Sequence, residues 1–134
     1  MSREAHAFSP DRDGQPYWAA AEDGYLALQR CGDCDAWRWP ARAICNRCHS
    51  FEARWERVSG RGRIVSWVVT HQPFAPDFRD RLPYVVASVA LEEQSDLVLL
   101  GNLLEGEPSP GLPVRAVFPV SPEGVRLLQW EPLA

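Results

Sequence analysis

The sequence predicts a mainly β protein that begins with a short helix, continues through a metal-binding ribbon and ends in a five-stranded barrel. Two observations carry this prediction. All four cysteines lie within the stretch CGDCDAWRWPARAICNRC, arranged as two C-x2-C pairs. Five apolar runs rich in β-branched residues follow, separated by proline, glycine and polar residues. A chain of 134 residues with 46% hydrophobic residues is long enough to bury a core of this kind.

The N-terminal part of the chain predicts an arm, a helix and a strand in that order. Residues 1–15 are polar and interrupted by chain breakers, which is typical of a flexible arm. Pro16 suits a first helical turn, and the following aromatic and alanine residues recur at helical spacing up to about Asp23. Gly24 then stops the helix, and the segment 25–30 (YLALQR) predicts a strand that leads into the first cysteine pair.

The two cysteine pairs have the spacing of a ribbon that binds one metal ion, and with the helix they form a predicted domain over 16–57. Each C-x2-C pair forms a tight turn, and ten residues between the pairs let the second turn face the first. We therefore predict that Cys31, Cys34, Cys45 and Cys48 bind a structural Zn²⁺ ion. Iron remains the alternative metal because it takes the same ligands. His49 directly follows a ligand, and adjacent side chains point apart, so it is not expected to bind the ion.

The third predicted region, 58–134, carries the five apolar runs. Their length and composition favour strands over helices, and five short strands suggest a barrel of the OB type, with a sandwich as the alternative. The runs are RGRIVSWVVTH, YVVASVALEE, DLVLLGNLLE, VRAVFPV and VRLLQWEPL.

Charge and targeting signals limit the class of protein. The formal net charge is −4 and the isoelectric point is about 5.3, which argues against a nucleic-acid-binding domain. No run of 18 apolar residues predicts a membrane span, and the N-terminus lacks the basic and apolar regions of a signal peptide. We therefore expect a cytoplasmic protein, in which paired cysteines more often bind metal than form disulfides.

The sequence contains no recognisable catalytic motif, which predicts a protein that is not catalytic alone. All four cysteines are assigned to the metal, and neither a G-x-S-x-G elbow nor a phosphate-binding glycine motif occurs. His71, at the end of a predicted strand, is the best single catalytic candidate, but a polar cap on that strand is the favoured explanation. It is also a candidate for contact with a partner or CoA.

Two stretches have the composition of a surface that binds a partner or ligand. The long connection 71–84 carries Phe74, Phe78, Arg79 and Arg81, and long connections with aromatic and arginine residues often form interfaces. The turn between the two cysteine pairs carries a second candidate set. Its members are Trp37, Arg38 and Trp39, and packing of the two tryptophans between ribbon and barrel is the alternative.

Several motifs together resemble the DUF35 family. They are DGYLALQRCGDC, PARAICNRC, the segment FEARWERVSGRGRIVSWVVTH, LPYVVASVALEE and GLPVRAVF, and the resemblance covers about residues 16–132. The resemblance implies a rubredoxin-like zinc ribbon joined to an OB-fold. One departure is Asp35, which stands where the family usually has glycine, so that the first cysteine turn is expected to lose some of its geometry.

The resemblance also implies a function. Such chains are similar to small subunits that bind thiolase-like enzymes, including acyltransferases and the lipid-transfer-type aldolases that shorten steroid side chains as CoA thioesters. It implies that the partner carries the catalytic residues and that this chain contributes to acyl-CoA binding. Residues 30–63 carry eight arginines, which offset the negative charge of the metal centre or, as the alternative, bind the phosphate groups of CoA or nucleic acid. Arg61 and Arg63 are the further candidates for this second role. A stand-alone acyl-CoA-binding protein and a single-stranded nucleic-acid-binding module are the alternatives.

Overall fold

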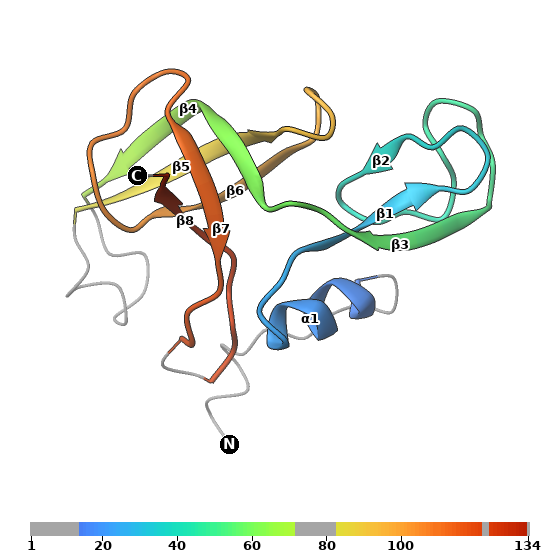
Figure 1. Ribbon diagram of the computed structural model, residues 1–134, viewed down its shortest axis with the longest axis horizontal. Coiled ribbons are helices and arrows are strands. Elements are labelled where there is room, and N and C mark those ends of the chain that lie inside the picture. The colour runs from blue at the N-terminus through green and yellow to red at the C-terminus, as the bar shows by residue number, and fades with distance from the viewer. Residues whose placement is uncertain (1–13, 72–82, 122–123, 134) are drawn as a thin grey trace. The chain divides into compact units, whose positions relative to one another are not determined.

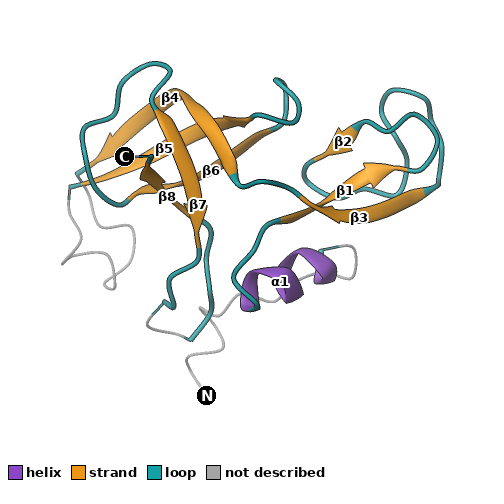
Figure 2. Cartoon of the chain, in the orientation of Figure 1, coloured by secondary structure: helices purple, strands orange, loops and turns teal. Residues whose placement is uncertain are grey.

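The computed structural model describes residues 14–71, 83–121 and 124–133. These residues form two compact units. One unit comprises the chain up to Ser59 together with Phe118–Leu127, and the other comprises Gly60–Val117 with the C-terminal residues from Leu128. Figures 1 and 2 show the helix and the strands of each unit. No helix of the described residues is long and apolar enough to cross a membrane. The predicted arm, 1–15, lies almost entirely outside the described residues.

The first unit contains the predicted short helix and a small sheet (Figure 2). Helix α1 (Gln15–Glu22) has a proline in its first turn, as expected, and buries Tyr17 and two alanines. The helix packs against strand β1 (Ala27–Cys31), which lies between two antiparallel partners. The partners are β2 (Trp37–Arg38) and β3 (Ala53–Arg57). The strand expected over 25–30 thus forms two residues later and ends at the first metal ligand.

The second unit is the predicted barrel, closed by five strands in the order β4-β5-β6-β8-β7. The C-terminal strand β8 closes the circle, because it pairs in parallel with β6 and antiparallel with β7, which in turn pairs with β4. The strands are β4 (Arg61–Thr70), β5 (Tyr84–Leu91), β6 (Val98–Leu103), β7 (Pro113–Val117) and β8 (Gln129–Pro132). A mostly β chain with one short helix and an OB-type barrel confirms the predicted fold class.

Close backbone packing inside the barrel depends on Gly62 and Gly101. The indole of Trp130 is fully buried beside Gly101, where an added Cβ would lie 2.9 Å from the indole nitrogen. At Gly62, where β4 passes between β5 and β7, an added Cβ would lie 2.5 Å from the carbonyl oxygen of Ala90. Because glycine has no Cβ, these two positions let neighbouring strands approach more closely than any other residue would.

Candidate metal centre

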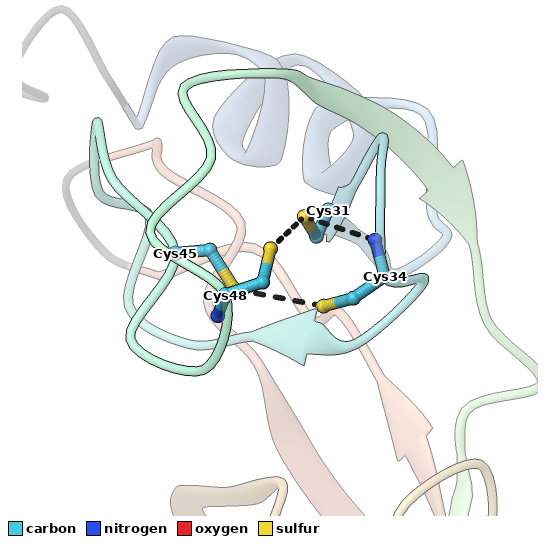
Figure 3. Close-up of side chains that lie close together, drawn as sticks. All are labelled: Cys31, Cys34, Cys45 and Cys48. Atoms are coloured by element: carbon cyan, nitrogen blue, oxygen red, sulfur yellow. Dashed lines mark hydrogen bonds between the residues drawn. The ribbon is translucent and has the colours of Figure 1, made fainter.

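The four cysteine sulfurs converge on one point in the first unit (Figure 3). Cys31 is the last residue of β1, Cys34 follows it in a tight turn, and Cys45 and Cys48 come from the segment before β3. The Sγ atoms of Cys31 and Cys48 are 3.6 Å apart, those of Cys34 and Cys45 are 3.7 Å apart, and all four lie within 4.8 Å of one another. A tetrahedral zinc ion with bonds of about 2.3 Å requires sulfur separations of about 3.8 Å. The cysteines are therefore positioned to bind a metal ion, as the sequence predicts.

The two cysteine turns repeat the same pattern of hydrogen bonds to sulfur. The backbone N–H groups of Asp33 and Cys34 donate to the Sγ of Cys31, both at 3.4 Å. In the second turn the equivalent groups donate to the Sγ of Cys45, at 3.3 Å and 3.5 Å. These donors lower the pKa of Cys31, and they lower the pKa of Cys45 to about 6. The first cysteine of each turn thus favours the thiolate, which is the form that binds metal.

Each cysteine turn ends in a residue with left-handed backbone geometry. Asp35 has φ 66° and His49 has φ 64°, and their N–H groups donate to the carbonyl oxygens of Cys31 and Cys45 at 3.2 Å and 2.9 Å. Aspartate and histidine adopt this conformation more readily than most residues other than glycine. Asp35 therefore forms the left-handed turn itself, and the loss of geometry expected at this position is not observed.

A network of ion pairs fixes Asp35 and the adjoining sheet. The guanidinium of Arg54 donates to the Asp35 carboxylate at 2.7 Å and also pairs with Glu56, which Arg30 contacts at 3.2 Å. Arg54 further donates to the carbonyl oxygen of Cys31 at 3.3 Å. The hydrogen bonds from Arg54 and its positive charge lower the pKa values of both the Asp35 and the Glu56 carboxyl groups. The Asp35 side chain is thus anchored by Arg54 of β3.

Trp37, Arg38 and Trp39, which the sequence offers as partner or CoA contacts, are largely covered in the structure. Trp37 is 9% exposed and Arg38 only 2% exposed, and Trp39 is half-buried. The guanidinium of Arg30 lies 4.7 Å from the centre of the Trp37 ring, and the ring of Trp39 lies 4.7 Å from that of Tyr17. These side chains pack the ribbon instead of presenting a surface.

Other apolar side chains are exposed in the first unit. Phe51 is 74% exposed and Ile44 is 41% exposed, and they flank the second cysteine turn on its two sides. Single exposed apolar side chains are common on protein surfaces, but these two are more accessible to a partner than the buried tryptophan Trp37. The sequence could have indicated them by their position next to the second cysteine turn, because such a turn is too small to bury a large side chain.

The structure brings Arg61 and Arg63 together on the barrel, as lining residues of one cavity of about 570 Å³. Arg63 donates to the carbonyl oxygen of Gly111 at 3.0 Å. The cavity wall also includes Glu92, Ser95 and the apolar residues Val65, Ala90, Leu91, Pro113 and Leu133. Cavities of this volume are typical of small-molecule sites.

The remaining predicted site residues stay unassigned. His71 is exposed and follows the end of β4. The other members of the connection lie outside the described residues, so their role stays a prediction. They are Phe74, Phe78, Arg79 and Arg81.

A four-cysteine ribbon followed by a closed five-stranded barrel defines a zinc-ribbon and OB-fold protein. Two family models match the same two regions of the chain. The rubredoxin-like zinc ribbon domain of ChsH2 matches residues 18–53, and the C-terminal OB-fold domain of ChsH2 matches residues 55–119.

The curated relatives differ in how much of their own length this chain matches. A DUF35 domain-containing scaffold protein of Methanocaldococcus jannaschii is 32% identical over 107 residues, which cover 75% of this chain and 73% of that protein. A 3-oxo-4,17-pregnadiene-20-carboxyl-CoA hydratase alpha subunit of Mycobacterium tuberculosis is 33% identical over 127 residues. A probable enoyl-CoA hydratase alpha subunit of Thermomonospora curvata is 38% identical over 88 residues. The matched regions span only 39% and 27% of these two hydratase subunits.

A solved structure agrees with this assignment. The Ltp2-ChsH2(DUF35) aldolase contains a chain that is 32% identical and superposes with a TM-score of 0.81, covering 94% of this chain and 98% of that one. The chain belongs to the DUF35 family.

Proposed function

We propose that this chain is a non-catalytic subunit that binds and supports a thiolase-like acyl-CoA enzyme. The observation that carries the proposal is the similarity over nearly the whole chain to a DUF35 chain of an aldolase complex. A retro-aldol lyase that acts on a CoA thioester is therefore the favoured partner, ahead of an acyltransferase. The name of the mycobacterial relative, a steroid carboxyl-CoA hydratase subunit, supports a steroid side chain as the acyl group.

We assign the metal centre a structural role with Zn²⁺ as its ion. The donor set supports this assignment, because four thiolates complete the tetrahedral coordination of zinc and leave no position for water or substrate. Bound zinc would link β1 to the segment before β3 in a unit whose sheet has only three strands. In this role Cys31, Cys34, Cys45 and Cys48 hold the ion and take no part in the reaction.

Co-expression with thiolase-like proteins of the source organism tests the subunit role. We expect one of them to co-purify with the chain and to cleave a hydroxyacyl-CoA thioester only when the chain is present. Replacing a catalytic residue of that partner should abolish cleavage without dissociating the complex. A chain that stays alone with every thiolase-like protein, and changes the activity of none, would refute the proposal.

A contribution to acyl-CoA binding is supported by the cavity on the barrel. Its two arginines suit the phosphate groups of CoA, and its apolar wall suits an acyl or pantetheine chain. Calorimetric titration of the complex with acyl-CoA should show binding that Arg63→Met weakens by about tenfold. Arg115→Met is the matched control, because Arg115 is exposed on β7, pairs with Glu131 and does not line the cavity. Equal affinities of the two variants would exclude the cavity as the CoA site.

A further inference from the structure

Arg38 is a buried cation without an acceptor among the residues that the structure describes. Its side chain is 2% exposed, and none of its three guanidinium nitrogens has a hydrogen-bond partner there. Burial of an unpaired charge is costly, so proteins almost always compensate it with an opposite charge. The position of Arg38 in the ribbon indicates where that charge lies.

Arg38 shares a face of the sheet with the first metal ligand. In the β1–β2 pair Arg38 lies directly opposite Gln29, so both side chains project from the same face. Cys31 lies two residues beyond Gln29 on β1 and therefore projects from that face as well. The spacing of strands and residues places the Cβ atoms of Arg38 and Cys31 about 8 Å apart.

The chain that leads to the second cysteine turn covers this same face. The backbone N–H of Arg42 donates to the Oε1 atom of Gln29 at 2.9 Å, and Cys45 follows three residues later. Arg38 thus lies in the part of the ribbon that connects both cysteine turns. Cys31 and Cys45 are themselves fully buried, so solvent screens the charges here only weakly.

The described carboxylates of the first unit do not provide the missing negative charge. Asp35 and Glu56 pair with Arg54 and Arg30, and Asp33 accepts a hydrogen bond from Ser50. The other acidic residues are exposed to solvent, namely Glu22, Asp23 and Glu52. A divalent ion bound by four thiolates, in contrast, carries a formal charge of about −2 at the centre of the ribbon.

We propose that Arg38 is a positioning residue of the metal centre, whose buried positive charge stabilises the anionic tetrathiolate. The proposal rests on the metal assigned above. Arg30 and Arg54 already pair with carboxylates, and Arg38 is the buried arginine of the described residues, so its charge is the one that solvent does not screen. Outer groups of this kind commonly change metal affinity by roughly ten- to a hundredfold.

Competition with a chelator tests the proposal on the full chain. Arg38→Met, which retains length and removes charge, should lower the Zn²⁺ affinity by at least about tenfold, whereas Arg38→Lys should retain most of it. Arg47→Met is the matched control, since it removes the same charge from an exposed side chain in the second cysteine turn. Its effect should stay below about threefold because solvent screens an exposed charge. If Arg38→Met does not fold, Arg38→Gln compared with Arg38→Lys gives the same test.

The reduction potential of the iron-substituted centre provides a readout that packing alone would not move. The reduced centre carries one more negative charge than the oxidised centre, so a nearby cation stabilises the reduced form and raises the potential. Loss of Arg38 should therefore lower the potential, and a tenfold change in relative affinity for the two oxidation states corresponds to about 59 mV. Arg38→Lys should restore it.

Three results would overturn the proposal. One is a Zn²⁺ affinity of Arg38→Met equal to that of Arg47→Met. Another is an unchanged potential. The third concerns the acidic residues outside the described part of the chain. If replacing Glu4, Asp11 and Asp13 by the corresponding amides lowers the Zn²⁺ affinity as much as Arg38→Met does, the partner of Arg38 is a carboxylate and not the metal centre. A native chain that binds no metal would refute the metal assignment as well, whereas metal binding unaffected by Arg38→Met refutes only the role of Arg38.

Discussion

Replacing Gly62 by alanine should destabilise the barrel where β4 lies between β5 and β7. The added methyl group would lie 2.5 Å from the carbonyl oxygen of Ala90 and 2.6 Å from the Cγ1 atom of Val89. The side chain of Val89 can rotate, but the carbonyl oxygen belongs to a paired strand and can move only with it. We therefore expect the cost of an overpacked core, about 1–3 kcal/mol. For a chain of this length the melting temperature should fall by roughly 4–12 °C.

Urea and thermal unfolding of the metal-loaded chain measure this effect, and Gly111 provides a control. Gly111 has φ 77° and nothing within 4 Å of an added Cβ, so its substitution changes backbone conformation without a clash. Asparagine tolerates that conformation, so Gly111→Asn should be close to native, whereas Gly62→Asn should be less stable than Gly62→Ala. The reasoning fails if Gly62→Ala unfolds within about 0.5 kcal/mol of the native chain, which is the range of ordinary surface substitutions.

The remaining predictions concern the ribbon. Asp35→Gly should have a melting temperature close to that of the native chain, whereas Asp35→Ala should melt at a lower temperature because alanine disfavours φ 66°. Equal melting temperatures of the two variants would contradict the left-handed turn. Cys34→Ser should lose metal and partner binding together, measured by metal content and pull-down, and a folded complex with a single catalytic step abolished would contradict a structural metal. The Asp35 and Glu56 carboxyl groups have folded pKa values below their ordinary 3.8 and 4.5, so their stabilisation is present above those values and is lost as pH falls through the folded ones. Arg54→Met should abolish this acid-dependent part of the unfolding free energy, and an unchanged pH profile in that variant would count against the ion-pair network.

The fold and the metal ligands could be predicted from sequence because both depend on local patterns. The C-x2-C spacing fixes each cysteine turn, and β-branched runs between breakers define strands before any long-range contact is known. The last run was the least accurate, since VRLLQWEPL forms a strand only from Gln129. The first three residues of this run, 125–127, instead belong to the first unit, where Val120 and Arg126 form an isolated bridge.

The surface could not be predicted in the same way, because exposure depends on what packs over a side chain. Trp37 and Trp39 lie between the two cysteine turns, where the sequence leaves both a contact surface and packing open, and Arg30 and Tyr17 contact them from other elements. The burial of Arg38 likewise depends on residues that pack over it and could not be predicted from the local sequence. The compensation of Asp35 by Arg54, 19 residues away, likewise required the pairing of β1 with β3.

The unequal exposure of the four sulfurs determines how the centre can be opened. In each turn the first cysteine is buried and holds backbone N–H donors, while the second cysteine, Cys34 or Cys48, is exposed. A chelator or an oxidant therefore meets the second sulfur of each pair first. Metal exchange should therefore begin at the exposed sulfurs of Cys34 and Cys48, and the buried sulfurs of Cys31 and Cys45 should release the ion last. The two exposed cysteines would then determine how long the ion stays bound. The two buried cysteines would contribute more to the stability of the ribbon.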